Sequence, residues 1–114
     1  MEHKHEKIVI NQLCSKLYGE MSRLYKVIGD PTRLRILYIL NGHELCVHEI
    51  VDALSISQSL ASHQLRVLKN HRLVKSLRRK NEVVYSLNDE HVKLLIDVAI
   101  EHIVEKEQNN ENRI

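Results

Sequence analysis

The sequence has no phenylalanine and no tryptophan, and it contains only one proline, three glycines and two cysteines among 114 residues. Because four tyrosines are the only aromatic side chains, stacking on single-stranded nucleic acid is disfavoured as a function. Two cysteines are too few for a disulfide framework, and no apolar run approaches the ~20 residues that a bilayer span needs. Since no secretory signal is visible either, we expect one small cytoplasmic domain that makes no membrane contact.

The charges are segregated along the chain, although the net charge is only +2. No acidic residue occurs between Asp52 and Glu82, and this stretch holds seven basic ones. The next stretch, from Glu82 to Glu107, is predominantly acidic. This pattern indicates a polyanion-binding surface followed by a segment that attracts cations, or, more simply, two solvated faces.

Hydrophobic periodicity predicts a mainly α chain with one small β-hairpin. We expect helices over 8–28, 31–40, 46–54, 58–71 and 88–107, and strands over 73–77 and 83–87. Residues 1–7 are predicted to be a flexible arm, 8–107 a single domain and 108–114 a solvated tail. Gly19 is expected to break or bend the first helix, and Asn81 to take the positive-φ position of the hairpin turn.

Two helices joined by the three-residue turn 55–57 predict a helix-turn-helix, whose second helix is free to enter a major groove. Short polar and basic side chains on that second helix would contact bases and phosphates, and the basic hairpin after it would track the DNA backbone as a wing. The candidate DNA-binding residues are Gln58, Ser59, Ser62, His63, Arg66, Lys69, Lys75, Arg78, Arg79 and Lys80.

The segments GDPTRLRILYIL, ELCVHEI, SQSLASHQLRVLK and VYSLNDEHV, in this order, resemble the ArsR/SmtB family of metal-sensing winged-helix repressors. The resemblance covers about residues 20–107. It implies a winged helix-turn-helix homodimer that binds double-stranded operator DNA without metal and releases it when metal binds, which derepresses metal efflux or detoxification genes. We therefore expect neither an enzyme nor a protein that binds a small organic substrate.

In that family, an Asp-x-His pair of one subunit and a His-x-x-(Glu or His) pair of the other form a zinc site. All four positions match here, as Asp89, His91, His102 and Glu105. Two carboxylates and two imidazoles suit tetrahedral Zn(II). His91 and His102 lie about 16 Å apart along one helix, so a single chain cannot close the site, whereas an antiparallel partner helix can. The spacing of these histidines with Leu95, Val98 and Glu105 is typical of a helix–helix interface.

The resemblance also implies a second metal site around Cys46, where related sensors carry thiolates. His48 stands where some relatives have a second cysteine, and Glu49 where others have an aspartate. The N-terminal arm would add Cys14, His3 and His5. Thiolates would favour Cd(II) or Pb(II) besides Zn(II), and Co(II) is a further candidate. Cys14 is equally well explained as a buried residue of its helix, whereas His3 and His5 are better explained as solvent-exposed residues of the arm.

Three alternatives remain at this point. His91 and His102 could merely flank a dimer interface, with Asp89 acting only as a helix N-cap. A repressor could respond to thiol oxidation through Cys14 and Cys46 instead of metal. A metal-buffering protein would need neither the basic stretch nor the wing.

Overall fold

The computed structural model describes the backbone of residues 2–111 and the side chains of residues 14–109. Its elements, in chain order, are α1 (Glu2–Gly29), α2 (Pro31–Leu40), β1 (Leu45–Cys46), α3 (Val47–Leu54), α4 (Gln58–Asn70), β2 (Val74–Arg79), β3 (Glu82–Leu87) and α5 (Glu90–Glu111). The expected mainly helical fold with a small β-hairpin is confirmed. None of the helices within residues 2–111 is both long and apolar enough to cross a bilayer.

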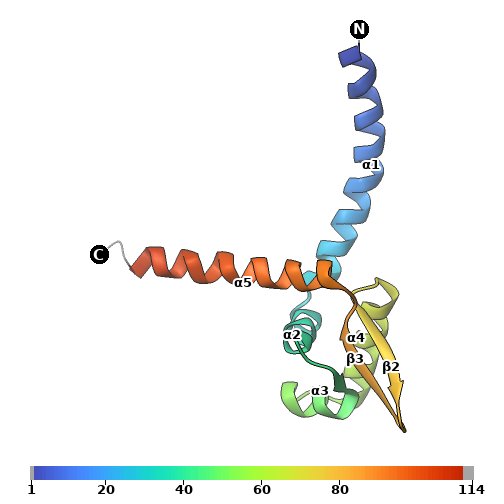
Figure 1. Ribbon diagram of the computed structural model, residues 1–114, viewed down its shortest axis with the longest axis vertical. Coiled ribbons are helices and arrows are strands. Elements are labelled where there is room, and N and C mark those ends of the chain that lie inside the picture. The colour runs from blue at the N-terminus through green and yellow to red at the C-terminus, as the bar shows by residue number, and fades with distance from the viewer. Residues whose placement is uncertain (1, 112–114) are drawn as a thin grey trace.

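The molecule consists of a small head and two long helical arms (Figure 1). The head contains α2, α3, α4 and the sheet, while α1 and α5 leave it in different directions. The radius of gyration is 18.4 Å, whereas a compact chain of this length would have about 13 Å. Among the described side chains, many on α1 and α5 therefore lie exposed.

The head is held by an apolar core to which every helix contributes. Its buried side chains are Val27, Ile36, Leu37, Leu40, Ile50, Leu54, Ala61, Leu65, Leu68, Leu73, Val74, Val92 and Ile96. The residues of α4 in this core recur every three or four positions, so they form one apolar face. The opposite face of α4 is left to solvent, as the sequence predicts for a DNA-reading helix.

Local sequence signals fix the helix boundaries in the head. The carboxylate of Asp30 accepts the backbone N–H of Arg33 at 3.0 Å, and Pro31 takes the first position of α2; both residue types are typical of these positions. The hydroxyl of Ser57 likewise accepts the N–H of Leu60 at 3.1 Å and caps α4. Gly42 has φ 80° just after α2, a left-handed conformation that glycine adopts without strain.

The sheet has three antiparallel strands in the order β1–β3–β2, where the sequence predicted only two. β1 is too short to leave a periodic signal. The prediction for the hairpin turn is wrong. Lys80, and not Asn81, adopts positive φ, at 55°. Arg79 pairs with Glu82, and such two-residue loops require positive φ at their first residue, with or without the second.

The two long helices, α1 and α5, are longer than the sequence predicts. α1 runs without interruption through Gly19, because a glycine costs a long helix only about 1 kcal/mol. The segment expected as an arm, residues 1–7, is helical from Glu2, and the segment expected as a tail is helical up to Glu111. On the shorter helix α4, Leu60 is exposed, since it lies off the buried face.

Candidate nucleic-acid interface and metal centre

The structure places most of the candidate DNA-contacting residues of α4 on one solvent-facing side. Gln58, Ser59, His63, Arg66 and Lys69 are exposed, and Ser62 is half-buried beside them. α3 and α4 are joined by a tight turn in which Ser55 has φ 55°. A helix that is anchored on one side and polar on the other can enter a major groove without unpacking.

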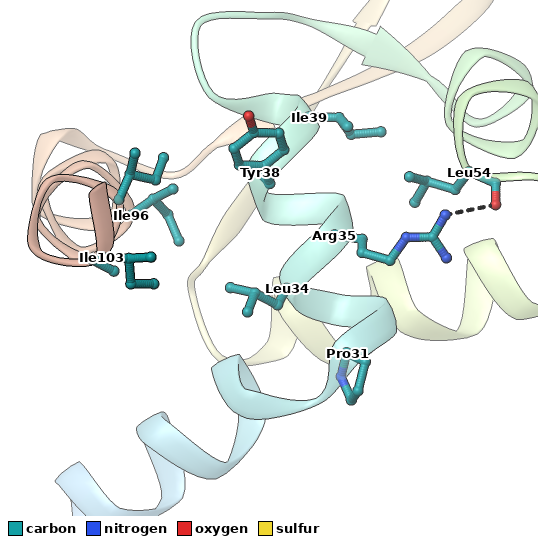
Figure 2. Close-up of a pocket in the computed structure, with 10 residues that line it drawn as sticks. Pro31, Leu34, Arg35, Tyr38, Ile39, Leu54, Ile96 and Ile103 are labelled. Carbon is teal, nitrogen blue, oxygen red and sulfur yellow. Dashed lines mark hydrogen bonds between the residues drawn. The ribbon is translucent and has the colours of Figure 1, made fainter. Parts of the chain in front are cut away.

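The orientation of α3 depends on an arginine that sequence reasoning overlooked. Arg35 of α2 donates from Nη2 to the carbonyl oxygen of Leu54, the last residue of α3, at 3.0 Å (Figure 2). Carbonyls at a helix C-terminus lack intrahelical donors, so this hydrogen bond satisfies one of them. A basic residue in the middle of the apolar α2 sequence was the available signal.

The wing carries the remaining basic candidates. Lys75, Arg78 and Lys80 are exposed on β2 and its turn, and no ion pair involves them within the described side chains. Arg79 instead pairs with Glu44, with Nη1 2.9 Å from Oε2.

Lys69 is also engaged within the protein. Its Nζ donates to the hydroxyl of Ser76 at 2.6 Å, and this hydrogen bond connects α4 to the wing. Lys69 and Arg79 can therefore set the position of the wing as well as contact phosphate. Sequence reasoning could not find their partners, because strand register and turn geometry bring these groups together.

Asp89 stands directly before α5 and caps it. Its Oδ1 accepts the N–H of Val92 at 3.1 Å, and its Oδ2 accepts from the side-chain amide of Asn88 at 3.1 Å. These hydrogen bonds, the first being the larger cause, lower the pKa of Asp89 below its usual value. The carboxylate is therefore ionised at neutral pH and can serve as a metal ligand as well as a cap.

His91 lies close to this carboxylate, with Nδ1 3.8 Å from Oδ1 of Asp89, and 90% of its side chain is exposed. His102 lies on the same side of α5, because both histidines line one open apolar groove together with Leu95, Val98 and Tyr25 of α1. Glu105 is exposed one turn further along α5. The four candidate ligands thus form two pairs, one near the start of α5 and one in its second half.

One chain does not bring these pairs together. Among the described side chains, no three of the His, Cys, Asp and Glu residues lie close enough to hold a metal ion. The eleven residues from His91 to His102 correspond to about 16 Å of helix rise, whereas a ligand atom sits about 2 Å from zinc. A four-ligand site therefore needs a second chain.

The candidates for the second site are distributed over α1 and α3. Cys46 is buried and stands before the first residue of α3. Its N–H donates to the carboxylate of Glu49 at 3.0 Å, and this hydrogen bond is the main cause that lowers the pKa of Glu49. Glu49 thus has a structural role as part of the helix cap. His48 is exposed.

Cys14 is half-buried on α1, while α1 and α3 lie at opposite ends of the molecule (Figure 1). The side chains of His3 and His5 lie outside the described ones. Among the described side chains of one chain, no three of these candidates come together as a metal site.

Large apolar side chains are exposed mainly on the two arms and on the side of α2 that faces α5. On α1 and α5 they are Leu17, Tyr18, Met21, Tyr25, Leu94, Val98, Ile103 and Val104. A second groove of about 470 Å³ lies between α2 and α5, where Leu34 and Tyr38 point toward Ile96 and Ile103 (Figure 2). Contiguous apolar surface of this kind marks an interaction site.

Comparison with known proteins agrees with this architecture. Residues 30–76 match the family described as bacterial regulatory protein, arsR family. The chain is 40% identical over 88 residues to the transcriptional repressor SmtB homolog of Synechocystis, covering 77% of this chain and 67% of that protein. It is 39% identical over 84 residues to the cadmium resistance transcriptional regulatory protein CadC homolog of Staphylococcus aureus, covering 73% and 69%.

A solved structure shares the fold. It is a homodimeric winged helix-turn-helix DNA-binding domain from Mycobacterium bovis, with a TM-score of 0.70 and 29% sequence identity. The superposition covers 82% of this chain and 84% of that one. With a winged helix-turn-helix head and these relatives, the chain belongs to the ArsR family of bacterial regulatory proteins.

Proposed function

We propose that the protein is a metal-responsive transcriptional repressor that acts as a homodimer. It binds operator DNA in the metal-free state and releases the DNA when Zn(II) binds between the subunits, which derepresses metal efflux or detoxification genes. The observation that carries this proposal is the placement of His91 and His102 along one open groove of α5, with the Asp89 carboxylate 3.8 Å from His91.

The DNA-binding half of the proposal rests on α4 and the wing. The exposed face of α4 combines Gln58, Ser59 and His63 with basic residues, and polar side chains of this kind read base edges in the major groove. Arg78 and Lys80 on the wing would bind phosphates without sequence preference. Affinity should therefore fall steeply with salt, because phosphate contacts release counterions.

The dimer rests on the exposed apolar residues of α1 and α5. Two copies related by a twofold axis present the same surface to each other, so both unpaired arms are covered at once. The similar structure from Mycobacterium bovis is homodimeric. An antiparallel pair of α5 helices would bring Asp89 and His91 of one chain beside His102 and Glu105 of the other.

The donor set favours Zn(II). Two imidazoles and two carboxylates form a closed, four-coordinate shell of nitrogen and oxygen, which suits Zn(II) and also Co(II). The cadmium resistance regulator among the relatives makes Cd(II) a second candidate. Cd(II) and Pb(II) prefer thiolates, and Cys46 with Cys14, His48, Glu49, His3 and His5 would be their donors at a second site.

A bound metal ion would fix the two α5 helices relative to each other. α5 is joined to the head by a closed hydrogen-bond network at the end of α2. The amide of Asn41 donates to Asp97 at 2.7 Å, and Lys93 Nζ donates to Asn41 at 2.9 Å and to Asp97 at 3.1 Å. A rotation of α5 would therefore also rotate the head of the same chain. In the dimer, the distance between the two heads must match DNA half-sites about one helical turn apart.

The direct test is a mobility-shift experiment on the promoter of the protein's own gene and on a scrambled duplex, with and without Zn(II). We expect a preference for the promoter that is lost on adding Zn(II). Release by oxidant but not by metal would support the thiol-redox alternative through Cys14 and Cys46. Tight metal binding without any promoter preference would support a metal buffer instead.

A further inference from the structure

The backbone carbonyl of Val27, near the end of α1, lacks its ordinary helical partner. In an α-helix this oxygen accepts the N–H four residues later, but that residue is Pro31, which has no N–H. Val27 itself is a buried core residue, and an unsatisfied carbonyl at a buried site is costly. Arg33 satisfies it, since its Nε donates to the Val27 oxygen at 2.8 Å.

The same guanidinium also binds α4, the helix proposed to read DNA and called the recognition helix below. Its Nη1 donates to Oε1 of Gln64 on α4 at 3.0 Å. The guanidinium is planar and its donors have fixed directions, so the end of α1 and the middle of α4 are attached to one rigid group. Arg33 is itself anchored, because its backbone N–H is bound by the N-cap carboxylate of Asp30.

Gln64 occupies an unusual place on α4. It is half-buried and lies one turn from Ala61 and Leu68, on the face that packs into the head. The proposed DNA-contacting side chains lie on the exposed face. Gln64 can therefore influence DNA recognition by holding α4 in place while the other face reads the bases.

We infer that the hydrogen bond between Arg33 and Gln64 positions the recognition helix against α1, and that both residues are positioning residues for operator recognition. This inference rests on the proposed function, because α1 carries part of the proposed dimer surface. With α1 fixed in the dimer, the link sets the direction in which each α4 faces its half-site. Random DNA, bound mainly through phosphates, is less sensitive to that direction.

The test uses the full-length, metal-free protein and two substitutions of nearly equal size. Gln64→Leu removes the acceptor, whereas Gln64→Glu keeps an oxygen for Arg33. We expect Gln64→Leu to lower the preference for operator over random DNA about tenfold and Gln64→Glu to stay within threefold of the wild type. Asn70→Leu, an amide-to-leucine change at the exposed end of α4, is the control and should leave the preference unchanged.

A double-mutant cycle with Arg33→Met identifies the partner. If the two residues act through one hydrogen bond, Arg33→Met combined with Gln64→Leu is no worse than the poorer single variant. Effects that multiply would overturn the inference, and so would a Gln64→Leu variant within twofold of the wild type. Equal losses in Gln64→Leu and Gln64→Glu would also overturn it, because Gln64 would then act without Arg33.

Hydrogen exchange on the free protein separates this inference from the proposed function. Gln64→Leu should increase exchange of the α4 amides while those of β2 and β3 keep the wild-type rate. Should Arg33→Met fail to fold, this measurement on the Gln64 variants still decides, because unchanged α4 exchange contradicts the inference. A wild type without operator preference would instead refute the proposed function, whatever the exchange shows.

Discussion

The guanidinium of Arg79 at the end of β2 is paired with the carboxylate of Glu44, 2.9 Å away in the loop before β1. Both side chains are substantially exposed. The guanidinium of Arg79, one of the positive charges of the wing, is thus already paired with a carboxylate of the same chain. A DNA phosphate that approaches Arg79 must compete with a carboxylate that is already in place.

Removing this competitor should strengthen DNA binding. Glu44→Gln is expected to tighten binding to operator and random duplexes alike, by about two- to fivefold, because an exposed ion pair contributes about 0.2–1 kcal/mol. Binding titrations at two salt concentrations measure the change. Glu107→Gln removes one negative charge as well, but in the second half of α5. An equal gain in DNA affinity from that variant would show that net charge alone is responsible.

Base reading and phosphate binding should separate between α4 and the wing. His63→Ala is expected to weaken operator binding by about 1–3 kcal/mol and random-DNA binding much less, because base contacts specify the sequence. Arg78→Ala should weaken both equally and reduce the salt slope by about one. If the wing, and not α4, reads the operator, Arg78→Ala would weaken mainly operator binding and His63→Ala would weaken operator and random-DNA binding equally.

Asp89 has two roles that one substitution can separate. Asparagine caps a helix about as well as aspartate, but it removes the anionic ligand. Asp89→Asn should therefore keep the wild-type helix content and metal-free DNA binding, and lose release by Zn(II). Circular dichroism and mobility shifts give both readouts. Release at the wild-type Zn(II) concentration would assign Asp89 to capping alone.

The network at Asp97 should make stability depend on acid pH. Hydrogen bonds from Asn41, and then from Lys93, lower the pKa of Asp97 below its usual value. A lowered folded-state pKa contributes stability that is present above the unfolded pKa and is lost as pH falls through the folded value. Asp97→Asn should thus lower the melting temperature at pH 7, and the difference should shrink below about pH 4. A constant difference across this range would contradict the assignment.

The sequence predicts the features that depend on local chemistry. The caps at Asp30 and Ser57 need only a side-chain oxygen and an amide three residues later, so their residue types suffice. The candidate ligands His91 and His102 of α5 could likewise be placed on one face from the helical period. Features that depend on tertiary register were missed, and these include β1 and the partners of Arg79 and Lys69.

The links made by Arg33 show the same limit. Because Pro31 lies four residues after Val27, the sequence alone shows that the Val27 carbonyl has no helical donor. That Arg33 supplies the donor and also reaches Gln64, 31 positions away, follows only from how α1, α2 and α4 pack. A polar residue on the apolar face of α4 was the one signal of Gln64 in the sequence.

Mixed dimers test whether one zinc site is shared between two chains. One chain carries Asp89→Ala with His91→Ala, and its partner carries His102→Ala with Glu105→Ala. We expect this mixed dimer to retain one complete site, to bind one Zn(II) with wild-type affinity and to respond on DNA, while each variant alone binds none tightly. A mixed dimer without tight Zn(II) binding, beside a wild type that binds it, would contradict the shared site.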